Sequence, residues 1–266
     1  MSDSPSTPGK SSDAKPDDSE PVRARPSAGR VAGAWAREIA IVVVGALIAS
    51  TLLRLFVAQM FVIPSGSMEN TLLIRDRVMV QKVAGWSRGD IVVFRDTQGW
   101  LSDPAEETDP VRKALIFIGL APDESSNHLI KRVIGLPGDH VKCCDAQGRI
   151  TVNGQPLDEA SYLYSDNGVT VAPSEFPFDV VVPKGRIWVM GDHRNNSQDS
   201  RCHLTEGTGG IAAFVPTADV VGSAVAVVYP FDRWRTLSRP ATFDQVPAAA
   251  APAPDTPVIV GDPPTC

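Results

Sequence analysis

The chain has 266 residues, a length that allows one or two domains. Its 25 Lys and Arg residues against 31 Asp and Glu give a net charge of −6, which argues against a nucleic-acid-binding protein, because such proteins usually carry a clustered basic excess. The 43 % share of hydrophobic residues argues against a multi-span membrane protein, and the 21 Gly and 23 Pro disfavour a helical bundle, since Pro removes a backbone donor.

The N-terminal part predicts a polar tail followed by a membrane anchor. Met1–Arg30 is rich in Ser, Pro, Asp and Lys and nearly lacks large apolar side chains, so residues 1–34 are expected to be a disordered tail. Ile39–Leu53 is almost wholly apolar, and the apolar character continues beyond Arg54. Residues 35–60 are therefore predicted to form a transmembrane helix, with Arg54 snorkelling to the far interface.

The orientation of this segment follows from the charges before it. Arginines precede the apolar stretch, which favours a cytoplasmic N-terminus. These are Arg23, Arg25, Arg30 and Arg37. The alternative is a cleaved secretory signal peptide, whose leading region and apolar core would both be unusually long here. We expect a single span, with everything after it outside the cytoplasm.

Residues 61–236 are predicted to be an extracytoplasmic and mainly β region. Arg77–Val83 alternates apolar and polar side chains, Ile91–Phe94 is a short β-branched run, and Asn153-Gly154 is a hairpin turn signal. Further strands are expected at 139–142, 149–152, 178–182, 186–190 and 220–228. One helix is expected at Pro110–Leu120, with its proline in the first turn. The Pro/Ala-rich residues 237–266 are expected to be a second disordered tail.

The first chemical signal is a turn, Pro-Ser-Gly-Ser, between two apolar stretches of residues 61–73. Gly66 permits a close backbone approach, and such a turn can present Ser67 Oγ beside free N–H groups. A nucleophile next to such donors suits acyl transfer, because the donors stabilise the developing oxyanion. The alternative is an ordinary Ser/Gly turn at a helix exit.

The second signal is Lys131, on the predicted strand that begins near His128. Alternation along a strand places Lys131 on the face of Leu129 and Val133, with Arg132 on the opposite face. Apolar surroundings lower a lysine pKa, and a neutral lysine can act as a general base. The alternative is a lysine at a strand edge, snorkelling to solvent.

The third signal is the polar loop Val189–Arg201, which follows a predicted strand and is rich in hydrogen-bonding side chains. Ser197, Asp199 and Arg201 are expected to orient the other two elements. The alternative is a solvated loop without a catalytic part.

Together, these stretches resemble bacterial type I signal peptidases, the Ser/Lys-dyad family also called leader peptidases. The resemblance covers the anchor, PSGSM directly after it, GDIVVF at 89–94, KRVIGLPGD at 131–139 and the GD-x-R-x-x-S-x-DSR loop at 191–201, in the order of the family. It implies two antiparallel β-domains: a catalytic one at about 61–140 and 186–236, and an inserted one at about 141–185.

The resemblance also implies a role for each matching residue. Ser67 matches the nucleophile, Lys131 the general base, Ser65 the side chain that joins the Ser67 N–H in the oxyanion hole, and Ser197 the serine that orients the lysine. The supporting loop residues are Asp192, Arg194, Asp199 and Arg201, with Asp199 paired to Arg132 or Arg201. The matching substrate-pocket residues are Phe61, Ile63, Pro64, Met68, Leu72, Leu129 and Ile130.

The implied reaction is removal of signal peptides from translocated preproteins at the plasma membrane, with small residues preferred at −1 and −3. The implied partners are signal peptides and the lipid bilayer, with the translocation machinery as a further candidate. No cofactor, metal or nucleic acid is expected. The family pattern is broken at His193, Asn195 and Leu129, and residues 96–127 form an insertion whose helix we expect to pack on the β-domain rather than touch the bilayer or the translocation machinery.

Other chemistries fit the sequence less well. A Ser–His–Asp enzyme would need Asp192 and His193 to face one point, which adjacent residues seldom do, and the scattered His128, His140 and His203 do not favour a metal site with the cysteines. Two rivals remain: another membrane-anchored Ser/Lys processing peptidase, and a catalytically silent relative that acts as a binding or assembly module.

The four cysteines are predicted to lie in a compartment that permits disulfides. Cys143 and Cys144 are adjacent, so we expect one of them to bridge Cys202 and tie the second domain to the catalytic loop. Cys266 is expected to be unpaired or intermolecular.

Overall fold

The computed structural model describes residues 28–101, 109–117 and 127–262, and it divides the chain into two units, 1–45 and 46–266. Helix α1 (Ala28–Phe56) contains the segment Trp35–Phe56, whose 22 residues with a mean hydropathy of 2.4 are long and apolar enough to cross a membrane. At 1.5 Å per residue this segment is roughly 33 Å long. The predicted boundaries were wrong by a few residues: the helix already includes 28–34, and it ends at Phe56 because Ala58 begins a strand.

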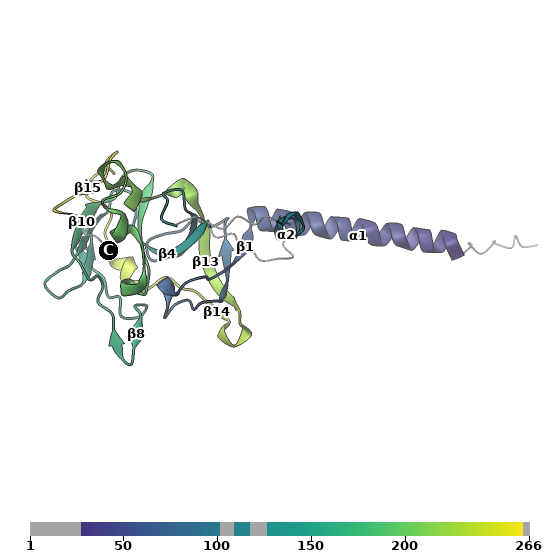
Figure 1. The fold of residues 1–266 in the computed structure, drawn as a ribbon, viewed down its shortest axis with the longest axis horizontal. Coiled ribbons are helices and arrows are strands. Elements are labelled where there is room, and N and C mark those ends of the chain that lie inside the picture. The colour runs from purple at the N-terminus through teal and green to yellow at the C-terminus, as the bar shows by residue number, and fades with distance from the viewer. Residues whose placement is uncertain (1–27, 102–108, 118–126, 263–266) are drawn as a thin grey trace, which may run out of the picture. The chain divides into compact units, whose positions relative to one another are not determined.

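Among the described residues the larger sheet contains eight strands, and all of its neighbouring strands are antiparallel. Figure 1 labels β1, β4, β13 and β14 of this sheet. Its order is β1-β2-β13-β3-β4-β11-β12, with β14 paired to β13. The bounds are β1 Ala58–Val62, β2 Arg77–Gln81, β3 Ile91–Arg95, β4 His128–Gly135, β11 Arg186–Met190, β12 Val215–Pro216, β13 Val220–Tyr229 and β14 Arg235–Thr236. The centre of this sheet combines strands that are distant in sequence, because β13 lies between β2 and β3.

A second sheet has the order β15-β10-β5-β6-β7, and β8 and β9 form a separate hairpin. The bounds are β5 His140–Cys143, β6 Ile150–Val152, β7 Gln155–Pro156, β8 Ser165–Asp166, β9 Val169–Thr170, β10 Phe178–Val181 and β15 Val258–Ile259. Helix α2 is Pro110–Phe117, so the predicted extension to Leu120 lies outside the described residues. The short 3-10 helices are η1 Gly66–Met68, η2 Arg194–Asn196, η3 Ser200–His203, η4 Thr208–Ala213, η5 Thr217–Asp219, η6 Phe231–Arg233 and η7 Ala241–Gln245. The prediction of a mainly β protein with one N-terminal apolar helix is confirmed.

The apolar runs form strands because both faces of the larger sheet are covered. Ile91 and Val93 of β3 pack in one hydrophobic cluster, whereas Val92 and Phe94 pack in another on the opposite face. A strand buried on both faces appears as a continuous apolar run in the sequence, as these residues do. The neighbouring strand β4 is likewise buried along most of its length. Its polar side chains are therefore covered as well.

The predicted C-terminal disorder was wrong for residues 237–262. Phe243 is only 2 % exposed and stacks on Tyr162, and Val246 belongs to the same core cluster. Farther along, β15 pairs with β10, and Lys184 N–H donates to the Pro254 carbonyl. A few isolated apolar side chains fix a segment whose Pro/Ala-rich composition resembles a loose tail. The last four residues lie outside the described part of the chain.

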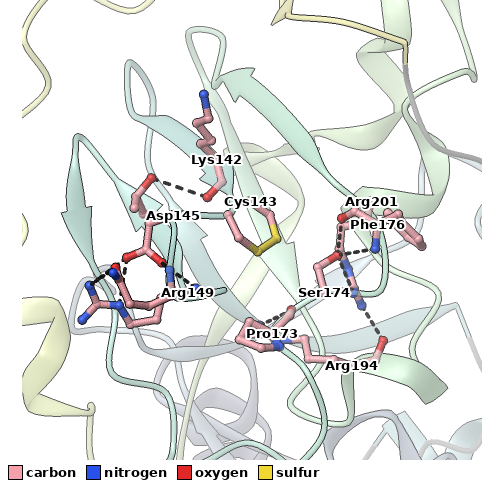
Figure 2. Close-up of a disulfide and its surroundings, with 12 residues drawn as sticks. Lys142, Cys143, Asp145, Arg149, Pro173, Ser174, Phe176, Arg194 and Arg201 are labelled. Carbon is pink, nitrogen blue, oxygen red and sulfur yellow. Dashed lines mark hydrogen bonds and ion pairs between the residues drawn. A yellow bond between two sulfur atoms is a disulfide. The ribbon is translucent and has the colours of Figure 1, made fainter.

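The disulfide also differs from the prediction. Cys143 at the end of β5 is bonded to the adjacent Cys144 (Figure 2). Neither sulfur is then available to Cys202, so the predicted bridge to the catalytic loop is wrong. The expectation for Cys266 lies outside the described residues.

Candidate active site

The turn that carries Ser67 is held by backbone hydrogen bonds on both sides. Ser65 is extended, with φ −135° and ψ 162°, and Gly66–Met68 then form a single 3-10 turn, η1. Leu72 N–H donates to the Met68 carbonyl over 2.7 Å, and Ile63 N–H donates to the Asp76 carbonyl over 2.9 Å. Ser67 is only 6 % exposed as a result, and its Oγ lies 3.5 Å from Ser65 Oγ.

Lys131 reaches this turn from the middle of β4. Its Nζ is 2.7 Å from Ser67 Oγ, which is within hydrogen-bond distance. The side chain is 2 % exposed, and its neighbour across the ladder is the fully buried Val92. The prediction that Lys131 faces covered, apolar surroundings is therefore confirmed.

Burial lowers the pKa of Lys131 to about 8, because an ammonium loses its hydration when it is enclosed. The negative charges of Asp199 and Asp192 act in the opposite direction, and the positive charge of Arg201 adds to the lowering. The neutral amine is thus accessible near physiological pH, and it lies beside a hydroxyl from which it can accept a proton.

Arg132, the next residue, points to the opposite face of β4 and is paired with Asp192. Its Nε and one terminal nitrogen donate to the two Asp192 carboxylate oxygens over 2.8 Å and 2.6 Å, and the other terminal nitrogen donates to the Gly89 carbonyl over 2.7 Å. Asp192 also accepts from Thr71 Oγ1, six residues after Ser65 in the turn region. This buried pair therefore ties the Ser67 segment to the strand that carries Lys131.

Asp199 forms a second buried ion pair, with Arg201. Arg201 Nε and one terminal nitrogen each donate to Asp199 over 2.9 Å, and Gly191 N–H and Ser197 Oγ donate to the same carboxylate over 2.9 Å and 2.8 Å. Burial opposes ionisation of Asp199, but the pair with Arg201 outweighs it and holds the Asp199 pKa below its usual range.

This arrangement decides between the two pairings expected for Asp199. The pair with Arg201 is confirmed, whereas the pair with Arg132 is wrong because Arg132 is engaged by Asp192. Ser197 directs its hydroxyl hydrogen to Asp199. Its expected contact with the lysine stays a prediction.

Arg194 connects the loop 191–201 to the segment predicted as the inserted domain. One terminal nitrogen donates to Glu159 Oε1 over 2.6 Å. The other donates to the Pro173 carbonyl, also over 2.6 Å (Figure 2). Figure 2 also shows Arg201 directed at Ser174, close to the ring of Phe176. Glu159 was not predicted from the sequence, since an isolated glutamate in a loop carries no pattern that marks it as buried.

The predicted pocket residues fall into three groups. Phe61, Ile63 and Ile130 are at most 7 % exposed and share a cluster with the fully buried Met68 and Leu72. Leu129 lies on the Lys131 face of β4 and packs in a different cluster, and Pro64 is exposed. The structure therefore brings five of the seven together beside the Ser67 turn, and their contact with substrate stays a prediction.

Comparison with known proteins assigns the class. The model of the family "Signal peptidase, peptidase S26" matches residues 35–229, so the chain belongs to this family of serine peptidases. Among similar proteins, signal peptidase I of Mycobacterium tuberculosis is 38 % identical over 222 residues, covering 74 % of this chain and 74 % of the relative. Signal peptidase I of Leptolyngbya laminosa is 33 % identical, covering 72 % and 78 %, and signal peptidase I U of Bacillus subtilis is 31 % identical, covering 74 % and 88 %.

Solved structures also match, among them a signal peptidase I from Enterococcus faecalis V583. It is 23 % identical, covers 53 % of this chain and 97 % of that chain, and gives a TM-score of 0.31.

Proposed function

We propose that this protein removes N-terminal signal peptides from translocated preproteins, with Ser67 as the nucleophile and Lys131 as the general base. The observation that carries the proposal is the 2.7 Å separation of Lys131 Nζ and Ser67 Oγ, with the lysine buried and its pKa lowered to about 8. Membership of the signal peptidase family supports it, as do the names of its relatives.

The reaction proceeds through an acyl-enzyme. The neutral amine of Lys131 accepts the Ser67 proton while Oγ attacks the scissile carbonyl, and the resulting ammonium donates that proton to the leaving amine. Ser67 N–H and Ser65 Oγ stabilise the oxyanion. A water molecule then hydrolyses the ester, again with Lys131 as base.

Substrate binds as an added strand in this account. Among the described residues, β1 is the strand at one edge of the larger sheet, and the pairing of β11 with β4 stops at Met190 and Arg132. The outer edge of β1 and the backbone of Leu129 and Ile130 can therefore pair with an extended peptide. Phe61 and His128 rings lie 5.2 Å apart, which places these two segments side by side. The preference for small residues at −1 and −3 fits the tight apolar packing around Ile63 and Ile130.

The membrane geometry is also part of the proposal. Trp35–Phe56 spans the plasma membrane once, with the N-terminus in the cytoplasm and the β-region outside, because the arginines before the span favour that orientation. The lipid bilayer and the signal peptides are then the direct partners, and the translocation machinery is a further one.

The test uses the full chain in lipid vesicles and a preprotein with Ala at −1 and −3. We expect wild type to release a product whose new N-terminus begins directly after the −1 alanine, and Ser67→Ala to release none. Cleavage at an unrelated site would favour a different processing peptidase. The absence of cleavage by wild type would favour a silent relative.

A further inference from the structure

We propose that Glu69 and His193 are positioning residues for the reaction at Ser67. Their contact fastens the turn that carries the nucleophile to the loop 191–201, and it compensates the negative charge of the Glu69 carboxylate, which lies over Gly66 beside the proposed oxyanion donor. This inference rests on the proposed role of Ser67 as nucleophile.

His193 contacts the Ser67 turn twice. Its backbone N–H donates to the Ser67 carbonyl over 3.1 Å, and its Nδ1 lies 2.9 Å from Glu69 Oε2. The imidazole is 13 % exposed and the glutamate side chain 27 %, so the contact is mostly shielded from water. His193 therefore holds both the backbone carbonyl of Ser67 and the side chain of Glu69, two residues later.

The imidazole of His193 is itself fixed by Tyr164. The two rings stack with their centroids 3.8 Å apart and an interplanar angle of 19°. Tyr164 N–H donates to the Asp192 carbonyl over 3.1 Å, so the ring beneath His193 is tied to the residue before it. This packing restricts where Nδ1 can point, and the carboxylate of Glu69 is fixed in turn.

The contact between His193 and Glu69 matters for the reaction because of where the Glu69 carboxylate lies. A Cβ placed on Gly66 would lie 2.8 Å from Glu69 Cδ and 2.9 Å from Oε2, so the carboxylate covers the residue before Ser67. The N–H of Ser67 is the proposed oxyanion donor, and an uncompensated negative charge close to it would oppose the charge that develops in the transition state. His193 compensates this charge with a hydrogen bond and keeps the carboxylate turned toward itself.

The residues on either side of His193 are anchored independently of it. Asp192 pairs with Arg132 and Arg194 pairs with Glu159. A substitution at His193 therefore removes the contact with Glu69 while these buried pairs remain.

The test measures kcat and KM for preprotein cleavage by the full chain in lipid vesicles, with the thermal unfolding midpoint recorded for each variant. His193→Phe keeps a ring against Tyr164 and removes Nδ1. His140→Phe is the matched control, because His140 Nε2 makes a similar contact, 2.6 Å from Asp179 Oδ1, in the second sheet. We expect His193→Phe to lower kcat about 10-fold with KM changed less than 2-fold, and His140→Phe to change neither.

Rescue separates this role from a merely structural one. Adding Glu69→Gln to His193→Phe removes the uncompensated charge, and we expect it to recover at least 5-fold in kcat. The inference is overturned if His193→Phe matches His140→Phe, or if the double variant recovers nothing. Ser67→Ala in the same assay keeps the two proposals apart: a fully active Ser67→Ala would overturn the proposed function, whereas an inactive Ser67→Ala beside a fully active His193→Phe would overturn this inference alone.

Discussion

The burial of Lys131 predicts a stability penalty that depends on pH. Its pKa falls from 10.5 to about 8 on folding. At about 1.4 kcal/mol for each tenfold change in proton affinity, this difference lowers the free energy of unfolding by about 3 kcal/mol at neutral pH. Between pH 8 and 10.5 the unfolded chain holds the proton and the folded chain does not, so the free energy of unfolding rises with pH through this window and the penalty is gone above it.

Lys131→Met tests this magnitude, because it keeps an unbranched side chain and removes the ammonium. We expect the variant to be more stable than wild type by about 3 kcal/mol at pH 7, and this advantage to disappear as the pH approaches 10.5. Urea unfolding of the full chain in detergent, followed by tryptophan fluorescence at both pH values, measures it. Lys142→Met is the control, since Lys142 is 50 % exposed beside Asp179.

The pH dependence of kcat/KM measures the pKa of Lys131 independently of stability. In the proposed mechanism the neutral amine of Lys131 is the active form, so kcat/KM for cleavage should rise about tenfold per pH unit below pH 8 and level off above it. A kcat/KM that keeps rising to the pKa of a free lysine would show that the pKa of Lys131 is not lowered, and so would the same pH dependence of stability in Lys131→Met and Lys142→Met.

Three further substitutions test the supporting structure. Gly191→Ala should lower kcat about 10-fold or more in the cleavage assay, because a Cβ there would overlap Ser197 Oγ and the Ser67 carbonyl oxygen; wild-type kcat would show that the loop can yield. Asp192→Asn leaves the Arg132 guanidinium uncompensated in a buried site and should cost about 3–5 kcal/mol in urea unfolding; a loss under 1 kcal/mol would contradict this. Phe243→Ala should cost about 3–5 kcal/mol, whereas Phe231→Ala, 81 % exposed, should cost almost nothing; equal effects would mean that the C-terminal segment is not part of the core.

Much of the site could be predicted from local patterns. The alternation along residues 128–135 placed Lys131 and Arg132 on opposite faces of a strand, and both orientations hold in the structure. The short β-branched runs marked the main strands within a residue or two. These features depend on periodicity and on residues that are neighbours in the chain. Both can be read from a single sequence.

The rest depends on tertiary contacts. The partner of Arg132 could not be chosen from spacing, because Asp192 is 60 positions away in sequence and comes next to it only through the pairing of β11 with β4. Glu159 and Phe243 each lie in polar or Pro/Ala-rich surroundings, and their burial comes from segments that pack on them. The same holds for Glu69, whose role emerges only when His193 is placed beside it.

We propose that Ser67 and Lys131 act as one catalytic unit. A double-mutant cycle on kcat/KM tests it most directly, with wild type, Ser67→Ala, Lys131→Met and the double variant cleaving the same preprotein in lipid vesicles. We predict that each single substitution lowers kcat/KM by about a thousandfold or more and that the double variant is no worse than either, because removing one member already disables the other. Near-wild-type cleavage by either single variant, or two losses that multiply in the double variant, would show that Ser67 and Lys131 do not act as one unit.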